Sequence, residues 1–402
     1  MSTLVMPRPV AASRAVRVQS IDILRGCVMI IMALDHVRDY FHAPSFLYDP
    51  TDLSHTSVAI FFTRWITHFC APVFFFLSGA SAFLNGRKKT KNELAFFLLT
   101  RGLWLILLEF TVMNFAWYFN PHFTTIDFII IWALGVSMIV LAGLIYLPIP
   151  LILLIGLLLI GAHNLLDGVH IKGQSFTAFL WSLLHDPNMF NYSRNLFVGY
   201  PVLPWIGVMA CGYCLGTLYS GAYDPEKRKK ILITLGLATI ALFLIVRGID
   251  YYGDQIHWTA QKNAMYTVMA FLRVSKYPPS LLYVLVTLGP ALLFLAFSEK
   301  PLNGLTGKIA VFGRVPLFYY ILHVYLIHLF AVVGVMLQGR PWSDMVFSTW
   351  VSENDNLRGY GYNLLTVYLI WILLVVMLYP VCKWYDNYKR THIAQQKWLS
   401  YL

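Results

Sequence analysis

The stretch SIDILRGCVMIIMALDHVRDYFH, residues 20–42, decides the fold class. It is long and apolar enough to cross a bilayer as one helix, yet it contains Arg25 and His36. Charged and titratable side chains are costly inside a membrane helix, so they mark a functional site. The eleven residues from Arg25 to His36 rise about 16 Å in a helix and return to nearly the same face. One stripe of this helix therefore carries a cation near one membrane surface and an imidazole near the other.

The composition is that of an integral membrane protein. Hydrophobic residues make up 58% of the 402-residue chain and charged residues 12%, whereas a soluble chain has roughly a quarter charged residues. The net charge of +11 does not indicate a nucleic-acid partner, because Lys and Arg are concentrated in the loops of one side. The first apolar segment carries charges and lacks a small-residue cleavage site, so we do not expect it to be a removable signal peptide.

We predict one all-α domain over residues 1–402, with about ten membrane-spanning helices of about 20 apolar residues each. Basic residues gather in alternate loops, for example 87–91 and 227–230, which by the positive-inside rule places both termini in the cytoplasm. A bacterial inner membrane is the expected location. The expected spans are 20–41, 58–84, 96–118, 126–147, 149–166, 199–220, 231–252, 278–298, 309–337 and 363–383.

Candidate catalytic residues lie near the outer ends of the first two spans. His36 is the expected general base, and either Asp39, about one turn further on, or Asp35 is expected to orient its ring. Arg64 and His68 are four residues apart, so they should share one helix face at a depth similar to that of His36. This arrangement predicts a shared polar cavity. The alternatives are charges that snorkel to water and a hydrogen-bonded pair that locks the two helices together.

Other polar residues in apolar segments have structural roles or alternative roles. Glu109, near mid-membrane, is expected to be paired rather than catalytic. His323 points away from the face that Arg314 and His328 share. Lys276 and Tyr277, in the proline-containing segment KYPPS, either face an outer substrate or cap the next helix. Their assignment depends on where the loop folds.

No metal site is expected, because the sequence lacks H-E-x-x-H, a second C-x-x-C and a P-loop. The one C-x-x-C pair, Cys211 and Cys214, lies among Gly207, Gly212 and Gly216. This small-residue spacing is typical of close helix contact, although a redox or metal pair is the alternative.

Four segments resemble the transmembrane acyltransferase superfamily, and within it the bacterial proteins similar to the catalytic domain of heparan-α-glucosaminide N-acetyltransferase. These segments are SIDILRG (20–26), THFCAPVFFFLSG (67–79), VLPWIGVMACGYCLG (202–216) and FGRVPLFYYILHVYLIH (312–328). The resemblance implies a membrane acetyltransferase that moves an acetyl group from cytoplasmic acetyl-CoA to a sugar hydroxyl or amine on the outer side. The expected partners are therefore acyl-CoA, a glycan or amino sugar, and the lipid bilayer.

The spacing of Arg25 and His36 also resembles the first-helix signature of bacterial membrane O-acyltransferases. In that family the histidine is assigned to catalysis and the arginine to the acyl-CoA side. The resemblance therefore implies that CoA lies near Arg25, Arg101 and Arg314. The arginine pair usual near the third helix of that family is here reduced to Arg101.

Several alternatives remain open from the sequence. His36 either activates the acceptor as a general base or is itself acylated, while His68 and Arg64 would stabilise the thioester oxyanion. A proton-coupled transporter or exporter would use the same buried polar groups as a relay, without turning over acyl-CoA. A non-catalytic scaffold would tolerate loss of His36. The oligomeric state is undecided, with a homodimer as one alternative.

Overall fold

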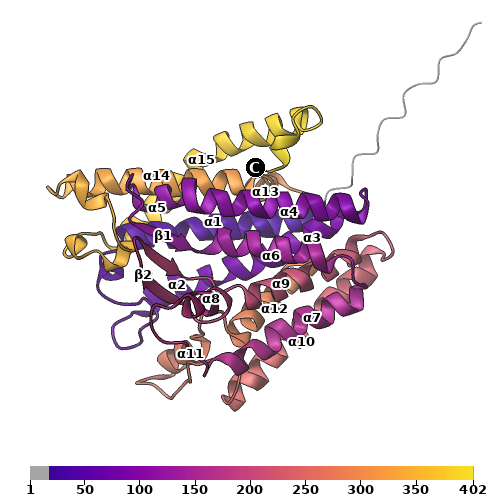
Figure 1. Cartoon of the computed structure of the whole chain (residues 1–402), viewed down its shortest axis with the longest axis horizontal. Helices are drawn as coiled ribbons and strands as arrows, with labels where there is room; N and C mark the ends of the chain where they lie inside the picture. The colour runs from indigo at the N-terminus through magenta and orange to yellow at the C-terminus, as the bar shows by residue number, and fades with distance from the viewer. Residues whose placement is uncertain (1–17, 402) are drawn as a thin grey trace, which may run out of the picture.

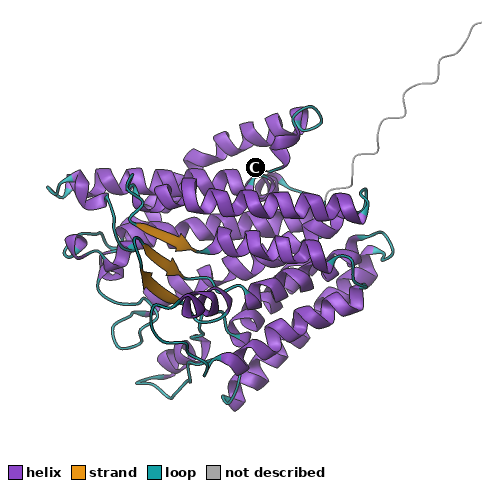
Figure 2. Ribbon diagram, in the orientation of Figure 1, coloured by secondary structure: helices purple, strands orange, loops and turns teal. Residues whose placement is uncertain are grey.

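The computed structural model describes residues 18–401, and its regular structure is nearly all helical (Figures 1 and 2). Each predicted span contains at least one helix, while α8 and α11 are short helices in the connecting segments. The helices are α1 Gln19–Phe41, α2 Val58–Trp65, α3 Cys70–Gly86, α4 Lys91–Leu108, α5 Asn114–Tyr118, α6 Ile130–Leu144, α7 Ile149–Ala162, α8 Phe176–Leu184, α9 Leu203–Leu215, α10 Pro225–Ile249, α11 Ala264–Leu272, α12 Leu281–Phe297, α13 Gly304–Arg314, α14 Pro316–Leu337 and α15 Leu364–His392.

The structure shows an integral membrane architecture. Within residues 18–401, six helical segments are long and apolar enough to cross a membrane. Helices α6, α9 and α12 are shorter, and α1 carries charged side chains near both ends. Ten spans and cytoplasmic termini therefore stay predictions. The six segments are Val58–Gly86, Lys91–Tyr118, Ile149–Leu166, Pro225–Ile249, Pro316–Leu337 and Leu364–His392.

Several expected spans have the wrong boundaries, and non-helical backbone explains two of the differences. The expected span 309–337 is broken between α13 and α14 at Val315, whose φ of −127° and ψ of 50° are not helical. Val315 precedes Pro316, and the proline ring disfavours helical backbone in the residue before it. The expected span 126–147 begins in a β-strand, so its helix starts only at Ile130.

A small β-sheet is the main departure from the all-α prediction. Its strands are β1 Thr125–Phe128, β2 Asn188–Asn191 and β3 Asn195–Val198, in the order β1–β3–β2. Strand β3 is parallel to β1 and antiparallel to β2. The sheet lies at the end of the bundle where α1 finishes, drawn in orange in Figure 2. We call this end the sheet end.

Helix α1 lies inside the bundle and contacts α3, α12, α13, α14 and α15 (Figure 1). Glycine allows the closest of these approaches. A Cβ atom on Gly313 of α13 would lie 1.9 Å from the carbonyl oxygen of Asp22 in α1. A Cβ atom on Gly212 of α9 would likewise lie 1.9 Å from the carbonyl oxygen of Phe76 in α3. These backbone contacts fix the position of α1, which carries most of the predicted site, and that of α3, which follows the segment with Arg64 and His68.

The contact of Gly212 with α3 indicates why the segment with Cys211 and Cys214 is rich in glycine. Gly207 packs against Gly156 of α7, and Gly212 packs against α3, so the glycines of α9 face neighbouring backbones. This confirms the interpretation of the segment as a close-packing pattern. The five cysteines are free thiols, and Cys214 donates a weak hydrogen bond to the carbonyl oxygen of Ile149 at 3.6 Å.

Candidate active site

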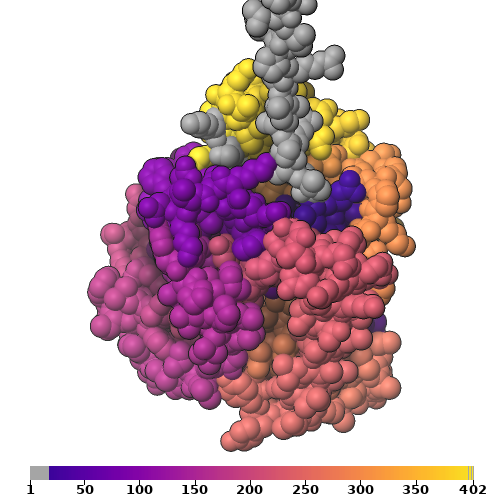
Figure 3. Space-filling view, turned by 90° about the vertical axis from the view of Figure 1, so that its right-hand side faces the viewer, coloured from indigo at the N-terminus to yellow at the C-terminus, as the bar shows by residue number. Residues whose placement is uncertain are grey.

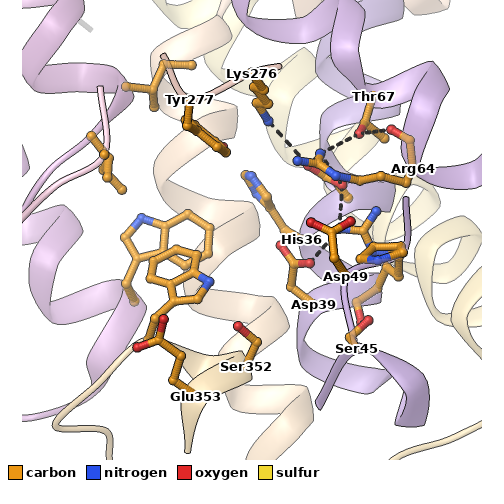
Figure 4. Close-up of a pocket in the computed structure, with 18 of the residues that line it drawn as sticks. His36, Asp39, Ser45, Asp49, Arg64, Thr67, Lys276, Tyr277, Ser352 and Glu353 are labelled. Atoms are coloured by element: carbon orange, nitrogen blue, oxygen red, sulfur yellow. Dashed lines mark hydrogen bonds and ion pairs between the residues drawn. The ribbon is translucent and has the colours of Figure 1, made fainter. Parts of the chain in front are cut away.

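A cavity of about 760 Å³ lies at the sheet end, between the second half of α1, the α2–α3 segment, the sheet and the connecting loops (Figure 4). Its size is within the range of small-molecule sites. Charged side chains and aromatic rings form its walls together. The charged residues are Asp35, Arg38, Asp39, Asp49, Arg64, Lys276, Glu353 and Arg358. The aromatic residues are Phe46, Tyr48, Trp117, Tyr118, Phe197, Tyr200, Tyr277, Tyr320 and Trp350.

His36 lines this cavity, as the sequence predicts for a catalytic residue. Figure 4 shows its ring facing the hollow between Lys276 and Asp39. Its Nδ1 atom lies 2.8 Å from Nε2 of His323 on α14, and the Trp117 ring packs against it at 4.8 Å in an edge-on arrangement. The prediction that an aspartate of the same helix orients His36 is therefore wrong, because the hydrogen-bond partner of its ring is His323.

Asp35 and Asp39 instead belong to an ion network in the cavity wall. Asp35 accepts hydrogen bonds from Arg64 Nη1 at 2.8 Å and lies 2.8 Å from Arg38 Nη2, while Lys276 Nζ is 3.9 Å away. Asp39 accepts from Arg38 at 2.6 Å. Two carboxylates thus hold three cations beside His36. Lys276 is the most loosely paired of the three, and Figure 4 shows it directed toward the network.

Arg64 reaches the cavity but His68 does not. After α2 ends, residues Ile66–Phe69 form a 3₁₀ turn, which has three residues per turn instead of 3.6. Arg64 therefore shares a face with Thr67, to which it donates a hydrogen bond at 3.1 Å. His68 is buried against Tyr283 with ring centroids 5.4 Å apart, outside the cavity lining. The prediction that Arg64 and His68 share one face is wrong for this reason.

The three arginines predicted to contact CoA lie outside the cavity, toward the other end of the helices. Arg25 donates to Ser81 Oγ at 2.6 Å and to the Gly313 carbonyl oxygen at 3.1 Å, so it ties α1 to α3 and α13. Arg101 lies on α4, in the candidate membrane span Lys91–Tyr118. Arg314 donates to Asp386 of α15 at 2.7 Å. The cationic and the titratable ends of the α1 stripe are therefore separated, as its spacing predicts.

Two buried carboxyl groups lie behind the cavity. Glu109 accepts hydrogen bonds from the backbone N–H groups of Ile131 and Trp132 at 2.7 and 2.9 Å, and so caps α6. This confirms the expectation that Glu109 is paired. Asp127 on β1 accepts from the Tyr118 hydroxyl at 2.8 and 2.9 Å. Burial raises the pKa of Asp127 to about 7, although the Tyr118 hydrogen bond acts to lower it.

Several cavity residues were not assigned to the site from the sequence. Trp117, Trp350 and Glu353 line the cavity, while His323 contacts His36 without lining it; all four come from segments far from α1 in the chain, and the packing of the bundle brings them together. Lys276 was expected either to face an outer substrate or to cap the next helix, and in the structure it lies in the cavity wall. Within residues 18–401, no group of three or more His, Cys, Asp or Glu side chains is placed to hold a metal ion.

A bundle of apolar helices with a histidine and an ion network in the wall of a cavity is the architecture of a polytopic membrane protein with a polar cavity. The chain belongs to the heparan-α-glucosaminide N-acetyltransferase catalytic-domain family, whose family model matches residues 17–248, more than half of its length. The matched range includes His36, Asp35 and Arg64, whereas Lys276 and His323 lie beyond it. No curated protein gives a significant sequence match.

Proposed function

We propose that this protein transfers an acetyl group from acetyl-CoA to a sugar hydroxyl or amine bound in the cavity. Membership of a membrane N-acetyltransferase family supports the reaction class. The observation that carries the proposal is the position of His36, whose ring forms part of the cavity wall next to an ion network with three cations. A base and an electrophile-stabilising group thus lie side by side, as acyl transfer requires.

The walls opposite the ion network suit a sugar acceptor. The rings of Trp117 and Trp350 lie 5.3 Å apart, and both line the cavity. Flat rings bury the apolar face of a pyranose, while carboxylates accept hydrogen bonds from its hydroxyl or amine groups. Figure 4 shows Ser352 and Glu353 on the rim across from Lys276. The acceptor therefore meets aromatic rings, acidic groups and His36 in the wall of the same cavity.

The transfer proceeds by proton exchange at His36 Nε2. This nitrogen takes the proton from the acceptor hydroxyl or amine while the acceptor atom attacks the acetyl carbonyl carbon. The new C–O or C–N bond forms, and the negative charge that develops on the carbonyl oxygen is stabilised by Lys276 or Arg64. The C–S bond then breaks, and the thiolate recovers the proton from His36. Acetylated sugar and CoA thiol are the balanced products.

The donor approaches from the end of the bundle opposite the sheet end, which is the cytoplasmic end in this proposal. A small pocket of about 130 Å³ at this end is lined by Arg87, Lys89 and Lys91. Figure 3 views this end and shows a hollow between the purple-magenta segments and the pink segments. These basic side chains, together with Arg25 and Arg101, supply positive charge for the CoA phosphates. The acceptor cavity is then on the outer side of a bacterial inner membrane.

The test is release of free CoA from acetyl-CoA by the purified protein in nanodiscs, with a panel of amino sugars and neutral sugars. Acceptor-stimulated release should fall about 10²- to 10⁴-fold in His36→Ala, because a general base contributes a factor of this size. His55→Ala is the matched control, since His55 lies in an exposed loop and pairs with Asp52. Undiminished release in His36→Ala, or no release with any sugar, would contradict the proposal.

A further inference from the structure

We propose that His323 is a positioning residue, which holds His36 in the tautomer that leaves Nε2 free to accept a proton. This inference rests on the proposed function for its catalytic meaning. Its structural content stands alone, because it concerns which nitrogen of His36 carries a hydrogen. His323 lies 287 residues further along the chain and outside the range of the family match.

The hydrogen bonds of His323 determine its own tautomer. Its Nδ1 atom lies 2.9 Å from the carbonyl oxygen of Tyr319, one turn earlier in α14. A carbonyl oxygen only accepts hydrogen bonds, so Nδ1 of His323 must carry the hydrogen. The ring is fully buried and packs against Tyr319 and Tyr320 at 5.0 and 5.5 Å, surroundings that favour a neutral imidazole. Nε2 of His323 is then an acceptor.

The tautomer of His36 follows from that acceptor. Because Nε2 of His323 has no hydrogen, the 2.8 Å contact requires Nδ1–H of His36 to donate. The lone pair of neutral His36 is therefore on Nε2. A neutral imidazole has one donor and one acceptor, so a partner at one nitrogen decides the chemistry of the other. His323 thus does for His36 what a carboxylate does in a hydrolase triad, without adding charge.

The same contact survives protonation of His36. The imidazolium still donates from Nδ1, so proton uptake and release at Nε2 require no movement of His323. Trp117 packs edge-on against the His36 ring at 4.8 Å, with an interplanar angle of 81°. Ring rotation, which would turn Nδ1 toward the cavity, is therefore opposed by packing as well as by the hydrogen bond. The site is preorganised for repeated proton transfer.

Two substitutions separate positioning from packing. His323→Gln keeps an acceptor, because the amide oxygen reaches about as far as Nε2 of histidine. His323→Phe keeps the ring but removes the acceptor. His328→Gln is the matched control, since His328 is buried on the same helix and contacts the carbonyl oxygens of Ala116 and Met345 instead. Any general loss of folding should appear in the control as well.

The readout is the ¹⁵N spectrum of histidine-labelled protein in lipid, in which the His36 signals are identified by their loss in His36→Gln. Wild type, His323→Gln and His328→Gln should show the hydrogen of neutral His36 on Nδ1, and His323→Phe should show it redistributed to Nε2. In the acetyl-transfer assay, kcat should fall on the order of 10²-fold in His323→Phe with little change in KM, and His323→Gln should recover most of it.

Each failure has a distinct signature. A hydrogen on Nε2 of His36 in wild type, or an unchanged tautomer in His323→Phe, would overturn the positioning role even if the protein acetylates sugars. If the tautomers are as predicted but acetyl transfer survives in His36→Ala, the positioning role stands and the proposed function is overturned. A fall in kcat of equal size in His323→Gln and His328→Gln would also overturn positioning, because it would show a packing effect.

Discussion

Neutralising Asp35 should destabilise the protein strongly, because this carboxylate compensates the cations of the cavity wall. Its side chain is only 11% exposed, and it lies 2.8 Å from both Arg64 and Arg38. Each hydrogen bond to a charged group contributes about 1.5–3 kcal/mol. In Asp35→Asn the amide oxygen keeps part of one bond, so two such contacts predict a loss of about 3–5 kcal/mol. Breaking a buried ion pair typically costs about the same.

A double-mutant cycle with Arg64→Gln tests the cause of this loss. The free energy of unfolding of the wild type, both single variants and the double variant is measured by denaturant titration in mixed micelles. Removing Arg64 as well relieves part of the uncompensated positive charge, so the two losses should overlap by about 1–3 kcal/mol. Asp52→Asn, in the exposed pair with His55, is the control and should change stability by less than about 1 kcal/mol. A loss below about 1 kcal/mol in Asp35→Asn, or strictly additive losses in the cycle, would show that Asp35 does not compensate the charge of Arg64.

Three further predictions concern packing, pH and acceptor binding. Gly313→Ala should lower thermal stability by about 1–3 kcal/mol, because the added Cβ meets the α1 backbone, whereas Gly307→Ala on the same helix meets open space and should not destabilise. Burial raises the pKa of Asp127 to about 7, so its contribution to stability is present at acid pH and is lost as pH rises through 7. Denaturation at several pH values should therefore show a decline in stability between about pH 4 and 7 that Asp127→Asn reduces; equal slopes over this range would contradict it. Trp350→Ala should raise the KM for the sugar roughly 10-fold and leave the KM for acetyl-CoA unchanged, which initial rates would show; an equal rise for both substrates would count against an acceptor role.

The local sequence pattern of α1 predicted its part of the site well. The spacing of Arg25 and His36 correctly separates a cationic end from an imidazole that lines a cavity. The corresponding spacing of Arg64 and His68 in the second predicted span gave a wrong result for His68. It assumed a continuous α-helix where the chain forms a 3₁₀ turn. A one-residue change in local geometry rotates the next side chains away from the cavity. Residue spacing alone cannot register such a change.

Contacts between distant segments were beyond the sequence. The helical spacing placed His323 off the face assigned to Arg314 and His328, and that placement carries no information about the contact of His323 with α1. The break at Val315 sets where α14 starts, and the close approach of Gly313 to α1 sets how the two segments meet. The sheet was missed for a different reason. Its strands have four residues each and contain several asparagines, so they lack the apolar alternation by which strands are recognised.

In the proposed function, His36 is the base for the transfer of an acetyl group from a donor on one side of the membrane to an acceptor on the other side. The most direct measurement uses vesicles of known protein orientation, with acetyl-CoA radiolabelled in the acetyl group on the side of the basic end and an amino sugar enclosed on the sheet-end side. Labelled sugar should appear inside vesicles of the wild type and His55→Ala proteins, and none above background should appear with His36→Ala. Labelled sugar formed only when both substrates share one side, or formed equally by His36→Ala, would contradict it.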